Sequence, residues 1–399
     1  MRFQVDRDVF ADAVAWAART LPARPPVPVL AGLLLEAGGA QTAGLALSSF
    51  DYEISAHAGI DATVAEPGRV LVSGRLLAEI SRSLPAQPVD VAVDGARVVV
   101  TCGSARFTLP MLPVDDYPTL PEMPAVAGTI GADVFAAAVA QVAVAAGRDD
   151  TLPVLTGVRV EIEGERVTLA ATDRYRLAVR ELRWQPERAN LSAVALVPAR
   201  TLAETAKALT GGAQVTVALS AAGDAGEGLI GFTGRSATSG QSGERRTTTR
   251  LLDGEYVKYR SLLPAEAAAT GFVETASFID AVKRVALVAP RNTPVRLTFE
   301  GSQVMLEAGT GEEAQAFESL DAQFDARDAE PAEFSIAFNP AYLLDGLGAV
   351  DAETTRLDFT TPNKPAVLRG SKKGSGVDAG EPAGDDDYRY LLMPVRLAG

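Results

Sequence analysis

At 399 residues, with 47% hydrophobic and 22% charged residues, the chain has the composition of a globular protein and is long enough for roughly two to four domains. Its net charge of -14 argues against a simple basic nucleic-acid binder, although basic residues could still gather on one face. A single cysteine, Cys102, and a single histidine, His57, exclude an internal disulfide, a His/Cys metal site and a histidine-based triad. The lone cysteine and the lack of an apolar run of ~18 residues predict a cytoplasmic protein without a membrane helix.

The sequence repeats itself at an interval of about 125 residues. Pro28–Gly32 (PVLAG) recurs as Pro153–Gly157 (PVLTG), and Ser73–Glu79 (SGRLLAE) recurs as Pro198–Glu204 (PARTLAE). A weaker third copy is found at Pro294–Val295 and Asn339–Leu343. This period is far longer than that of a solenoid repeat, so we expect three whole α+β domains.

Each repeat is expected to open with an amphipathic helix, followed by strands, a second short helix and further strands. The first helices are predicted at residues 8–19, 133–146 and 277–289. Asp6, Ser277 and Asn339 are candidate helix caps or neighbours of caps, because a short polar side chain accepts hydrogen bonds from the free amides of a first turn.

The strands of the second repeat are clearest in Pro153–Val179. Hydrophobic residues alternate with charged ones from Val158 to Ile162, which is the period of a half-buried strand. Glu163–Glu165 is predicted to be a hairpin turn, and the alternation resumes beyond it.

Proline-containing exits at residues 115–121 and 253–264 place the expected domains at 1–124, 125–265 and 266–399. Residues 234–249 and 371–387 interrupt the pattern because they are rich in Gly, Ser and charge. They lack an apolar set that could offset the entropy cost of ordering, so we interpret both as mobile surface loops.

Basic residues recur at equivalent places in this acidic chain. We expect a basic pair on one helix face in each repeat, and a further arginine after the first helix of repeats one and two. These residues are Arg75 and Arg82, Arg200 and Lys207, Lys283 and Arg284, and Arg24 and Arg148. The side chains expected opposite the first pair are Leu76, Leu77, Ile80 and Leu84. The basic residues are either the solvated side of each helix or, if equivalent helices form a ring, one pooled surface.

Other signals point away from catalysis. No GxxxxGK[ST] motif occurs, so nucleotide hydrolysis is not expected. Asp385–Asp387 lies in a Gly-rich segment without further ligands and is interpreted as solvated charge. Two alternatives stay open at this point: a metal-dependent phosphohydrolase built on Asp173 and the acidic clusters, and a scaffold that does not bind nucleic acid.

A set of short motifs is spread along the chain. They are Met1–Phe3, Arg24–Pro25, Pro28–Leu30, Arg106–Leu109, Ala171–Val179, Asp253–Gly254, Phe338–Leu344 and Leu391–Leu397. Together these motifs resemble the family of bacterial DNA polymerase III beta subunits, the sliding clamps, with an actinobacterial-like composition. They span the chain, and the ATDRYRLAV segment with the MPVRL tail is the most specific pair.

The resemblance implies three similar clamp domains, each with two helices packed on antiparallel sheets. It implies a head-to-tail homodimer that closes a six-domain ring around duplex DNA, binds it without sequence preference and is loaded by a separate ATP-driven clamp loader. It implies no catalytic residue, no metal and no cofactor. The expected partners are the replicative polymerase alpha subunit, the clamp loader, translesion polymerases, ligase and mismatch-repair proteins, all bound through short linear peptides.

By resemblance, Arg24, Arg75 and Arg200 face DNA, with Arg148 on an adjacent loop, whereas Pro153 and Val154 replace aromatic residues of some relatives. The resemblance also implies a pocket for partner peptides. Its residues are Leu155, Thr172, Arg174, Tyr175, Arg176, Leu177, Val257, Leu262, Asn339, Tyr342, Pro365, Met393, Pro394, Val395, Arg396 and Leu397. Departures from many relatives at Arg174, Tyr175 and Val257 are expected to shift peptide preference. The alternative for Leu155 and Leu177 is that they are ordinary core residues.

For the ring seam, Phe107 and Leu109 follow the β-rich run Val98–Thr101. An edge strand of this kind needs a partner. The family pairs it with the third domain of the other subunit, near Leu287 and Val288. An internal strand is the alternative.

Overall fold

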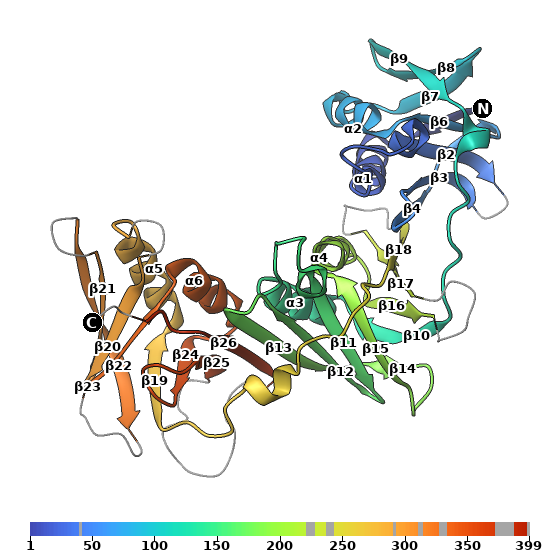
Figure 1. Ribbon diagram of the computed structural model, residues 1–399. Coiled ribbons are helices and arrows are strands. Elements are labelled where there is room, and N and C mark those ends of the chain that lie inside the picture. The colour runs from blue at the N-terminus through green and yellow to red at the C-terminus, as the bar shows by residue number, and fades with distance from the viewer. Residues whose placement is uncertain are drawn as a thin grey trace. The chain divides into compact units, whose positions relative to one another are not determined.

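The computed structural model describes residues 1–39, 42–220, 228–236, 243–289, 293–309, 314–326, 333–371 and 387–396. The chain divides into two compact units, which we describe separately (Figure 1). The first unit comprises residues 1–137, 163–165 and 183–252, and the second comprises 138–162, 166–182 and 253–399. This division runs through the second predicted domain, so the boundaries after residues 124 and 265 remain predictions.

Six helices occur in the described part of the chain. They are α1 (Arg7–Ala18), α2 (Gly74–Ser83), α3 (Ala132–Ala143), α4 (Ala199–Ala208), α5 (Thr275–Ala286) and α6 (Pro340–Ala349). Two predicted caps are confirmed, because the carboxylate of Asp6 accepts from the first-turn amides of α1 and the amide oxygen of Asn339 does so for α6. Ser277 is not a cap: Glu274 caps α5 by accepting from the Ser277 amide.

The first unit contains one long antiparallel sheet. Its order is β14-β10-β16-β17-β18-β4-β3-β2-β6-β9-β8-β7-β1-β5. The strands of this unit are β1 (Arg2–Val5), β2 (Gly32–Gly39), β3 (Thr42–Phe50), β4 (Ile54–Ile60), β5 (Thr63–Glu66), β6 (Gly68–Ser73), β7 (Val89–Asp94), β8 (Arg97–Cys102), β9 (Ala105–Leu112), β10 (Val126–Gly131), β14 (Gln185–Pro186), β15 (Ser192–Pro198), β16 (Gln214–Leu219), β17 (Leu229–Arg235) and β18 (Glu244–Arg250).

The second unit has a sheet in the order β11-β12-β13-β26-β25-β24-β19-β22-β21-β20-β23. Its strands are β11 (Gly157–Glu163), β12 (Arg166–Thr172), β13 (Arg176–Arg183), β19 (Ala269–Glu274), β20 (Val295–Glu300), β21 (Gln303–Ala308), β22 (Ala316–Ala326), β23 (Glu333–Phe338), β24 (Thr354–Phe359), β25 (Ala366–Ser371) and β26 (Tyr388–Leu392). The short 3-10 helices are η1 (Pro28–Ala31), η2 (Val114–Asp116), η3 (Pro153–Thr156) and η4 (Tyr259–Leu262).

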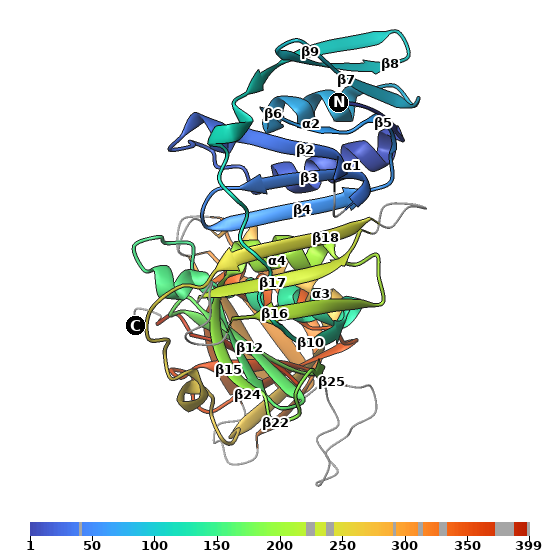
Figure 2. The same cartoon turned by 90° about the vertical axis from the view of Figure 1, so that its right-hand side faces the viewer.

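The prediction of a mobile loop at residues 234–249 is wrong for its described ends. Residues 234–235 end β17, and 244–249 lie in β18, which pairs with β17 on one side and with β4 on the other (Figure 2). Thr247, Thr248 and Thr249 are buried, because a central strand satisfies its backbone on both edges and favours β-branched side chains. Residues 237–242 lie outside the described part of the chain.

The second predicted loop, 371–387, is corrected at one end. Ser371 is buried at the end of β25, and residues 372–386 lie outside the described residues.

A buried ion pair joins α1 to β18 inside the first unit. The guanidinium of Arg245 donates to the carboxylate of Asp12, which also accepts from the hydroxyl of Ser236 at 2.8 Å. Arg245 also lies over the ring of Trp16, 5.2 Å from its centroid. Loss of either partner would leave the other charge buried without compensation. The pair therefore favours this one arrangement of α1 against β18.

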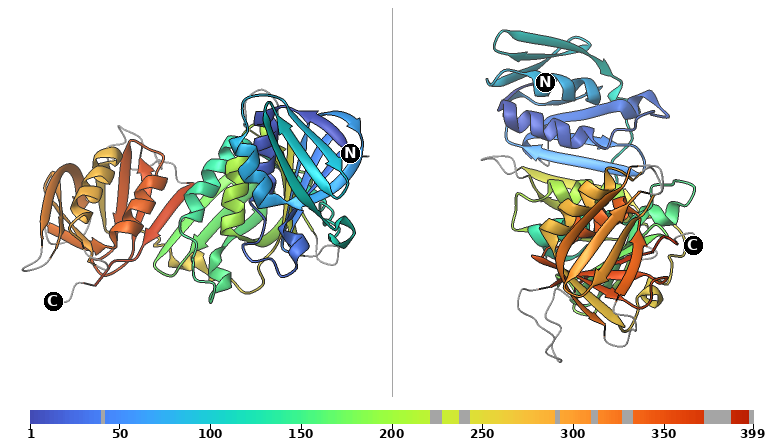
Figure 3. Two further views of the ribbon diagram at one scale, coloured as in Figure 1. Left: turned by 90° about the horizontal axis from the view of Figure 1, so that it is seen from above. Right: turned by 90° about the vertical axis from the view of Figure 1, so that its left-hand side faces the viewer.

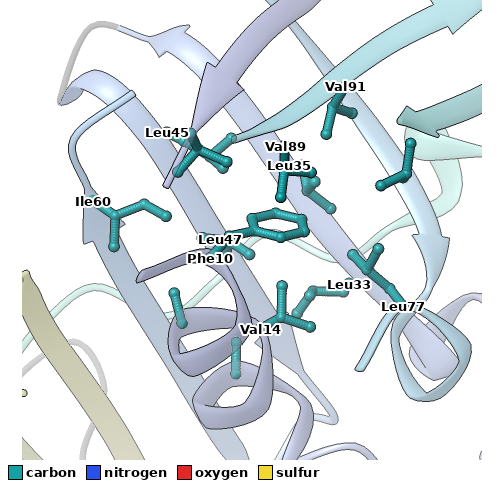
Figure 4. Close-up of a cluster of buried hydrophobic side chains, with 14 of the residues drawn as sticks. Phe10, Val14, Leu33, Leu35, Leu45, Leu47, Ile60, Leu77, Val89 and Val91 are labelled. Carbon is teal, nitrogen blue, oxygen red and sulfur yellow. The ribbon is translucent and has the colours of Figure 1, made fainter. Parts of the chain in front are cut away.

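The core of the amino-terminal part lies between α1, α2 and the sheet (Figure 4). Phe10 and Val14 from α1 pack against Leu35 and Leu47 from β2 and β3. Leu77 of α2 is buried in the same cluster, whereas Leu76, expected beside it, is exposed. Truncating a fully buried phenylalanine such as Phe10 to alanine costs about 3–5 kcal/mol.

Helices also cover the strands of the carboxy-terminal part. α5 and α6 lie side by side on one face of its sheet (Figure 3). α5 buries Phe278, Val282 and Val285, and α6 buries Leu343 and Leu347, the spacing of an apolar helix face. None of the helices described is long and apolar enough to cross a membrane.

Candidate functional site

A pocket of about 540 Å³ lies within the second unit. Three segments line it: the loop after α3, the turn between β12 and β13, and the first turns of α6. The lining residues are Ala146, Gly147, Arg148, Asp149, Leu152, Leu155, Asp173, Arg174, Tyr175, Arg176, Ala341, Tyr342 and Asp345. Charged side chains make up nearly half of this lining, and apolar or aromatic residues make up the rest, so the pocket combines apolar surface with groups that can orient a ligand.

Hydrogen bonds hold the turn between β12 and β13. One oxygen of Asp173 accepts from the amides of Tyr175, at 3.0 Å, and Arg176, at 3.1 Å. The Thr172 hydroxyl donates to the carbonyl of Arg176 at 2.6 Å. Arg174 has a φ of +81°, in the left-handed region that non-glycine residues rarely adopt. The turn therefore presents Arg174 and Tyr175 in a fixed direction.

Arg176 is a buried cation at the base of the pocket. Its guanidinium donates to Asp173 at 2.9 Å, to Asp345 at 2.5 Å and to the hydroxyl of Tyr390 at 3.4 Å. Burial alone would lower the pKa of Arg176, but Tyr390, Asp345 and Asp173 outweigh burial and raise the pKa. Arg176 therefore stays charged and ties the β12–β13 turn to α6.

Two tyrosines form the aromatic wall. The rings of Tyr175 and Tyr342 stack with centroids 6.1 Å apart, and the Arg176 guanidinium lies 4.4 Å from the Tyr342 centroid. Burial, together with the nearby Asp173 carboxylate, raises the pKa of Tyr342, so its phenol remains neutral. Tyr175 is 53% exposed, so part of this wall is open to a ligand.

The loop after α3 completes the rim. The Gly147 amide donates to the Leu155 carbonyl at 2.8 Å, which closes the loop over η3. Asp149 accepts from both the hydroxyl and the amide of Thr151, and these hydrogen bonds lower the pKa of its carboxyl. Asp149 is therefore an ionised, exposed carboxylate beside the exposed Arg148.

Five of the residues predicted for the pocket line it: Leu155, Arg174, Tyr175, Arg176 and Tyr342. Thr172 and Leu177 do not, because both are buried in the strands that flank the turn. Asn339 caps α6, and the Met393 amide donates to the Tyr175 carbonyl at 2.9 Å.

The remaining predicted pocket residues do not line this pocket. Val257, Leu262 and Arg396 are exposed, and Pro365, Pro394 and Val395 are half-buried. Leu397 lies outside the described residues.

Sequence reasoning missed Asp173 and Asp345 as pocket residues and assigned Arg148 to DNA alone. The pairing of Asp173 with Arg176, three residues later, was a usable local signal. Asp345 is 169 residues away from Arg176 in the chain, and only the packing of α6 beside β26 brings it near. Nothing local in the sequence signals that contact.

A second cluster fixes the linker that carries Val257 and Leu262. The carboxylate of Glu161 accepts from the Tyr259 hydroxyl at 2.9 Å, from Arg260 at 2.5 Å and from Arg159 at 2.6 Å. Burial opposes the ionised form, but these hydrogen bonds outweigh it and lower the pKa of Glu161. Burial and the Glu161 contact raise the pKa of Tyr259 to about 12.

The comparisons with known proteins cover the whole chain. Family models of the DNA polymerase III beta subunit match in three parts: the N-terminal domain at residues 1–121, the central domain at 129–258 and the C-terminal domain at 260–396. The beta sliding clamp of Streptomyces coelicolor is 59% identical over 399 residues, 100% of both chains.

The chain belongs to the bacterial beta sliding clamp family. The DNA polymerase sliding clamp of Bacillus subtilis has the same fold, with a TM-score of 0.84 at 24% identity over 100% of both chains. A sliding clamp of Pseudomonas aeruginosa bound to griselimycin is 25% identical, with a TM-score of 0.82 over 100% of both chains. The fold is thus that of three DNA-clamp domains, and the chain is a non-catalytic clamp of DNA replication. Membership of the family implies a homodimer that encircles DNA and serves a polymerase.

The basic residues that the sequence analysis assigned to DNA are exposed in the structure. Arg24, Arg75, Arg82, Arg148, Arg200, Lys207, Lys283 and Arg284 are all exposed. Three of them carry partners that reduce their free charge: Arg284 makes a two-point contact with Glu318, Arg200 pairs with Glu204 at 3.1 Å, and Lys283 pairs with Asp280 at 3.4 Å. Arg75 donates to the Pro22 carbonyl at 3.1 Å, which orients its side chain.

The predicted seam residues differ in exposure. Leu109 is buried in the core of its own chain, and Phe107, two residues earlier on the same face of β9, is half-buried against the same core. Leu287 is 84% exposed and Val288 is half-buried. Among the described strand pairings, a stretch of edge is free on both β9 and β22: β9 contacts β6 only through Met111 and Leu112, and residues 316–321 of β22 pair with β21 alone.

The phosphohydrolase alternative depended on Asp173. Both of its oxygens accept hydrogen bonds within the turn or from Arg176, which gives Asp173 a positioning role. Within the described residues, no group of three or more His, Cys, Asp or Glu side chains could hold a metal ion.

Proposed function

We propose that the pocket binds short linear peptides of the proteins that work on the encircled DNA. These partners are the replicative polymerase alpha subunit, the clamp loader, translesion polymerases, ligase and mismatch-repair proteins. The observation that carries the proposal is the open aromatic wall of Tyr175 and Tyr342 beside Leu152 and Leu155, with the charged groups set at the rim. Apolar anchors of a peptide would fill the pocket, and rim groups would orient the chain.

We further propose that the eight basic residues named above contact DNA phosphates from the inside of a ring. Their exposure supports this role, since guanidinium and ammonium groups on helix faces reach phosphates without reading bases. We expect Arg24, Arg75, Arg82 and Lys207 to contribute more than Arg284, whose charge is offset by Glu318.

For the head-to-tail dimer we propose pairing of β9 with β22 across the seam. The free edges of both strands and the exposed Leu287 support it. Phe107 and Val288 would pack at the seam, while Leu109 would support β9 from its own core. We also propose domain boundaries after residues 124 and 265 and a cytoplasmic, nucleoid-associated location.

Replacement of Tyr342 tests the pocket. Tyr342→Ala removes half of the stacked pair, so binding of a fluorescein-labelled peptide from the carboxy-terminal tail of the replicative polymerase should weaken at least tenfold by fluorescence anisotropy. Tyr52→Ala is the matched control, because Tyr52 is a half-exposed tyrosine of the first unit. Equal affinity for both variants would contradict the assignment of the pocket.

A further inference from the structure

We propose that Arg174 determines which peptides the pocket accepts, by favouring ligands with a carboxylate next to their apolar anchor. This inference rests on the proposed peptide-binding function and adds a chemical preference to it. It is carried by the backbone of Arg174, by the balance of charge at the rim and by the neighbouring aromatic wall.

The backbone of Arg174 is unfavourable for an arginine. Its φ of +81° suits glycine, which would adopt this turn without strain. The hydrogen bonds of Thr172 and Asp173 impose the turn regardless of the residue at position 174. An arginine held here at a conformational cost points to a use for its side chain, as strained residues at binding sites commonly do.

The charges of the pocket leave the rim positive. Asp173 and Asp345 are both bound to Arg176, so one guanidinium faces two carboxylates at the base and leaves one negative charge there. The rim then carries Arg148 and Arg174 against the single carboxylate of Asp149. Among the residues that the structure describes, the side chains of Arg148 and Arg174 form no hydrogen bond or ion pair, and the Arg174 amide donates to the Thr172 hydroxyl at 3.3 Å. Both guanidinium groups therefore remain available to an anionic ligand.

The aromatic wall beside Arg174 indicates which kind of anionic ligand the rim would bind. Arg174 directly precedes Tyr175 and lines the same pocket as Tyr342. A side chain anchored against these rings would bring its neighbours in the peptide within reach of the rim. A guanidinium binds a carboxylate in a planar two-point contact and rejects an ammonium group. A peptide carboxylate fits this setting, and DNA phosphate is the alternative that the experiment separates.

The test compares three labelled peptides, Gly-X-Leu-Phe-X-Gly with X as Asp, Asn or Lys, on the full-length protein at low salt. The wild type should bind the Asp peptide about threefold tighter than the Asn peptide, the range of an exposed ion pair, and the Lys peptide most weakly. Arg174→Gly should remove most of this discrimination, so that its affinities for the Asp and Asn peptides become nearly equal, and the turn should persist because glycine suits it. Arg174→Lys should keep part of the discrimination, and Arg188→Gln, an exposed arginine outside the pocket, should keep all of it.

The outcomes separate the two proposals. If no peptide binds and Tyr342→Ala changes nothing, the peptide-binding function fails and this inference fails with it. If peptides bind but Arg174→Gly discriminates as the wild type does, only the inference is overturned. Loss of duplex DNA affinity in Arg174→Gly, with peptide discrimination intact, would assign Arg174 to DNA phosphate instead.

Discussion

At the scale of single residues, Arg176 explains why the pocket has a defined shape. One buried guanidinium holds the β12–β13 turn through Asp173 and α6 through Asp345, and its face covers Tyr342. The motif around Arg176 was recognisable in the sequence. The partner on α6 was not, because a contact across 169 residues leaves no local pattern.

Replacing Arg176 should therefore damage both stability and binding. In Arg176→Met the two aspartates lose their shared cation. The free energy of unfolding of this region should fall by about 2 kcal/mol, less than for a fully buried pair because Asp345 is half-exposed. Thermal unfolding followed by calorimetry measures this loss, with Arg166→Met as an exposed control expected to stay within about 0.5 kcal/mol. Equal unfolding temperatures for the two variants would show that the Arg176 cluster is not structural.

At the scale of elements, regular helices were predictable and context-dependent strands were not. Apolar spacing placed α1 within one residue of its bounds, and the predicted caps Asp6 and Asn339 marked the starts of α1 and α6. β18 was mistaken for a loop because Glu244–Arg250 has no apolar residue. This segment forms a strand because it pairs with β4 and β17, and the Asp12–Arg245 ion pair fixes it against α1. Composition alone carries no information about such tertiary pairing.

The exposed face of α2 carries a prediction about DNA. Arg75→Glu combined with Arg82→Glu should weaken binding to a short DNA duplex. The slope of the logarithm of the binding constant against the logarithm of the salt concentration should become less negative by about 0.9 for each lost phosphate contact. Fluorescence anisotropy titrations at salt concentrations from about 50 to about 200 mM measure both the affinity and its salt dependence. The paired control Arg183→Glu with Arg188→Glu alters net charge equally at exposed positions off the helices. If the control variant loses as much affinity, general charge rather than the α2 face binds DNA.

At the scale of the whole molecule, the repeat in the sequence already predicted the domain architecture, because each copy must bury its own helices on its own strands. The sequence could not give the closure of a ring, since that depends on a second copy of the chain. Free strand edges at β9 and at residues 316–321 of β22 are the features of a single chain that favour such closure. An acidic protein that encircles DNA can stay bound by topology, with only its inner face contacting phosphates.

Small-angle X-ray scattering with an absolute mass, in moderate salt, tests this account most directly. A mass twice the 41.6 kDa of one chain, with a scattering profile that requires a central hole, is the predicted result. A monomer, or a dimer whose profile fits without a hole, would contradict encirclement and leave the pocket as the feature of a peptide-binding scaffold.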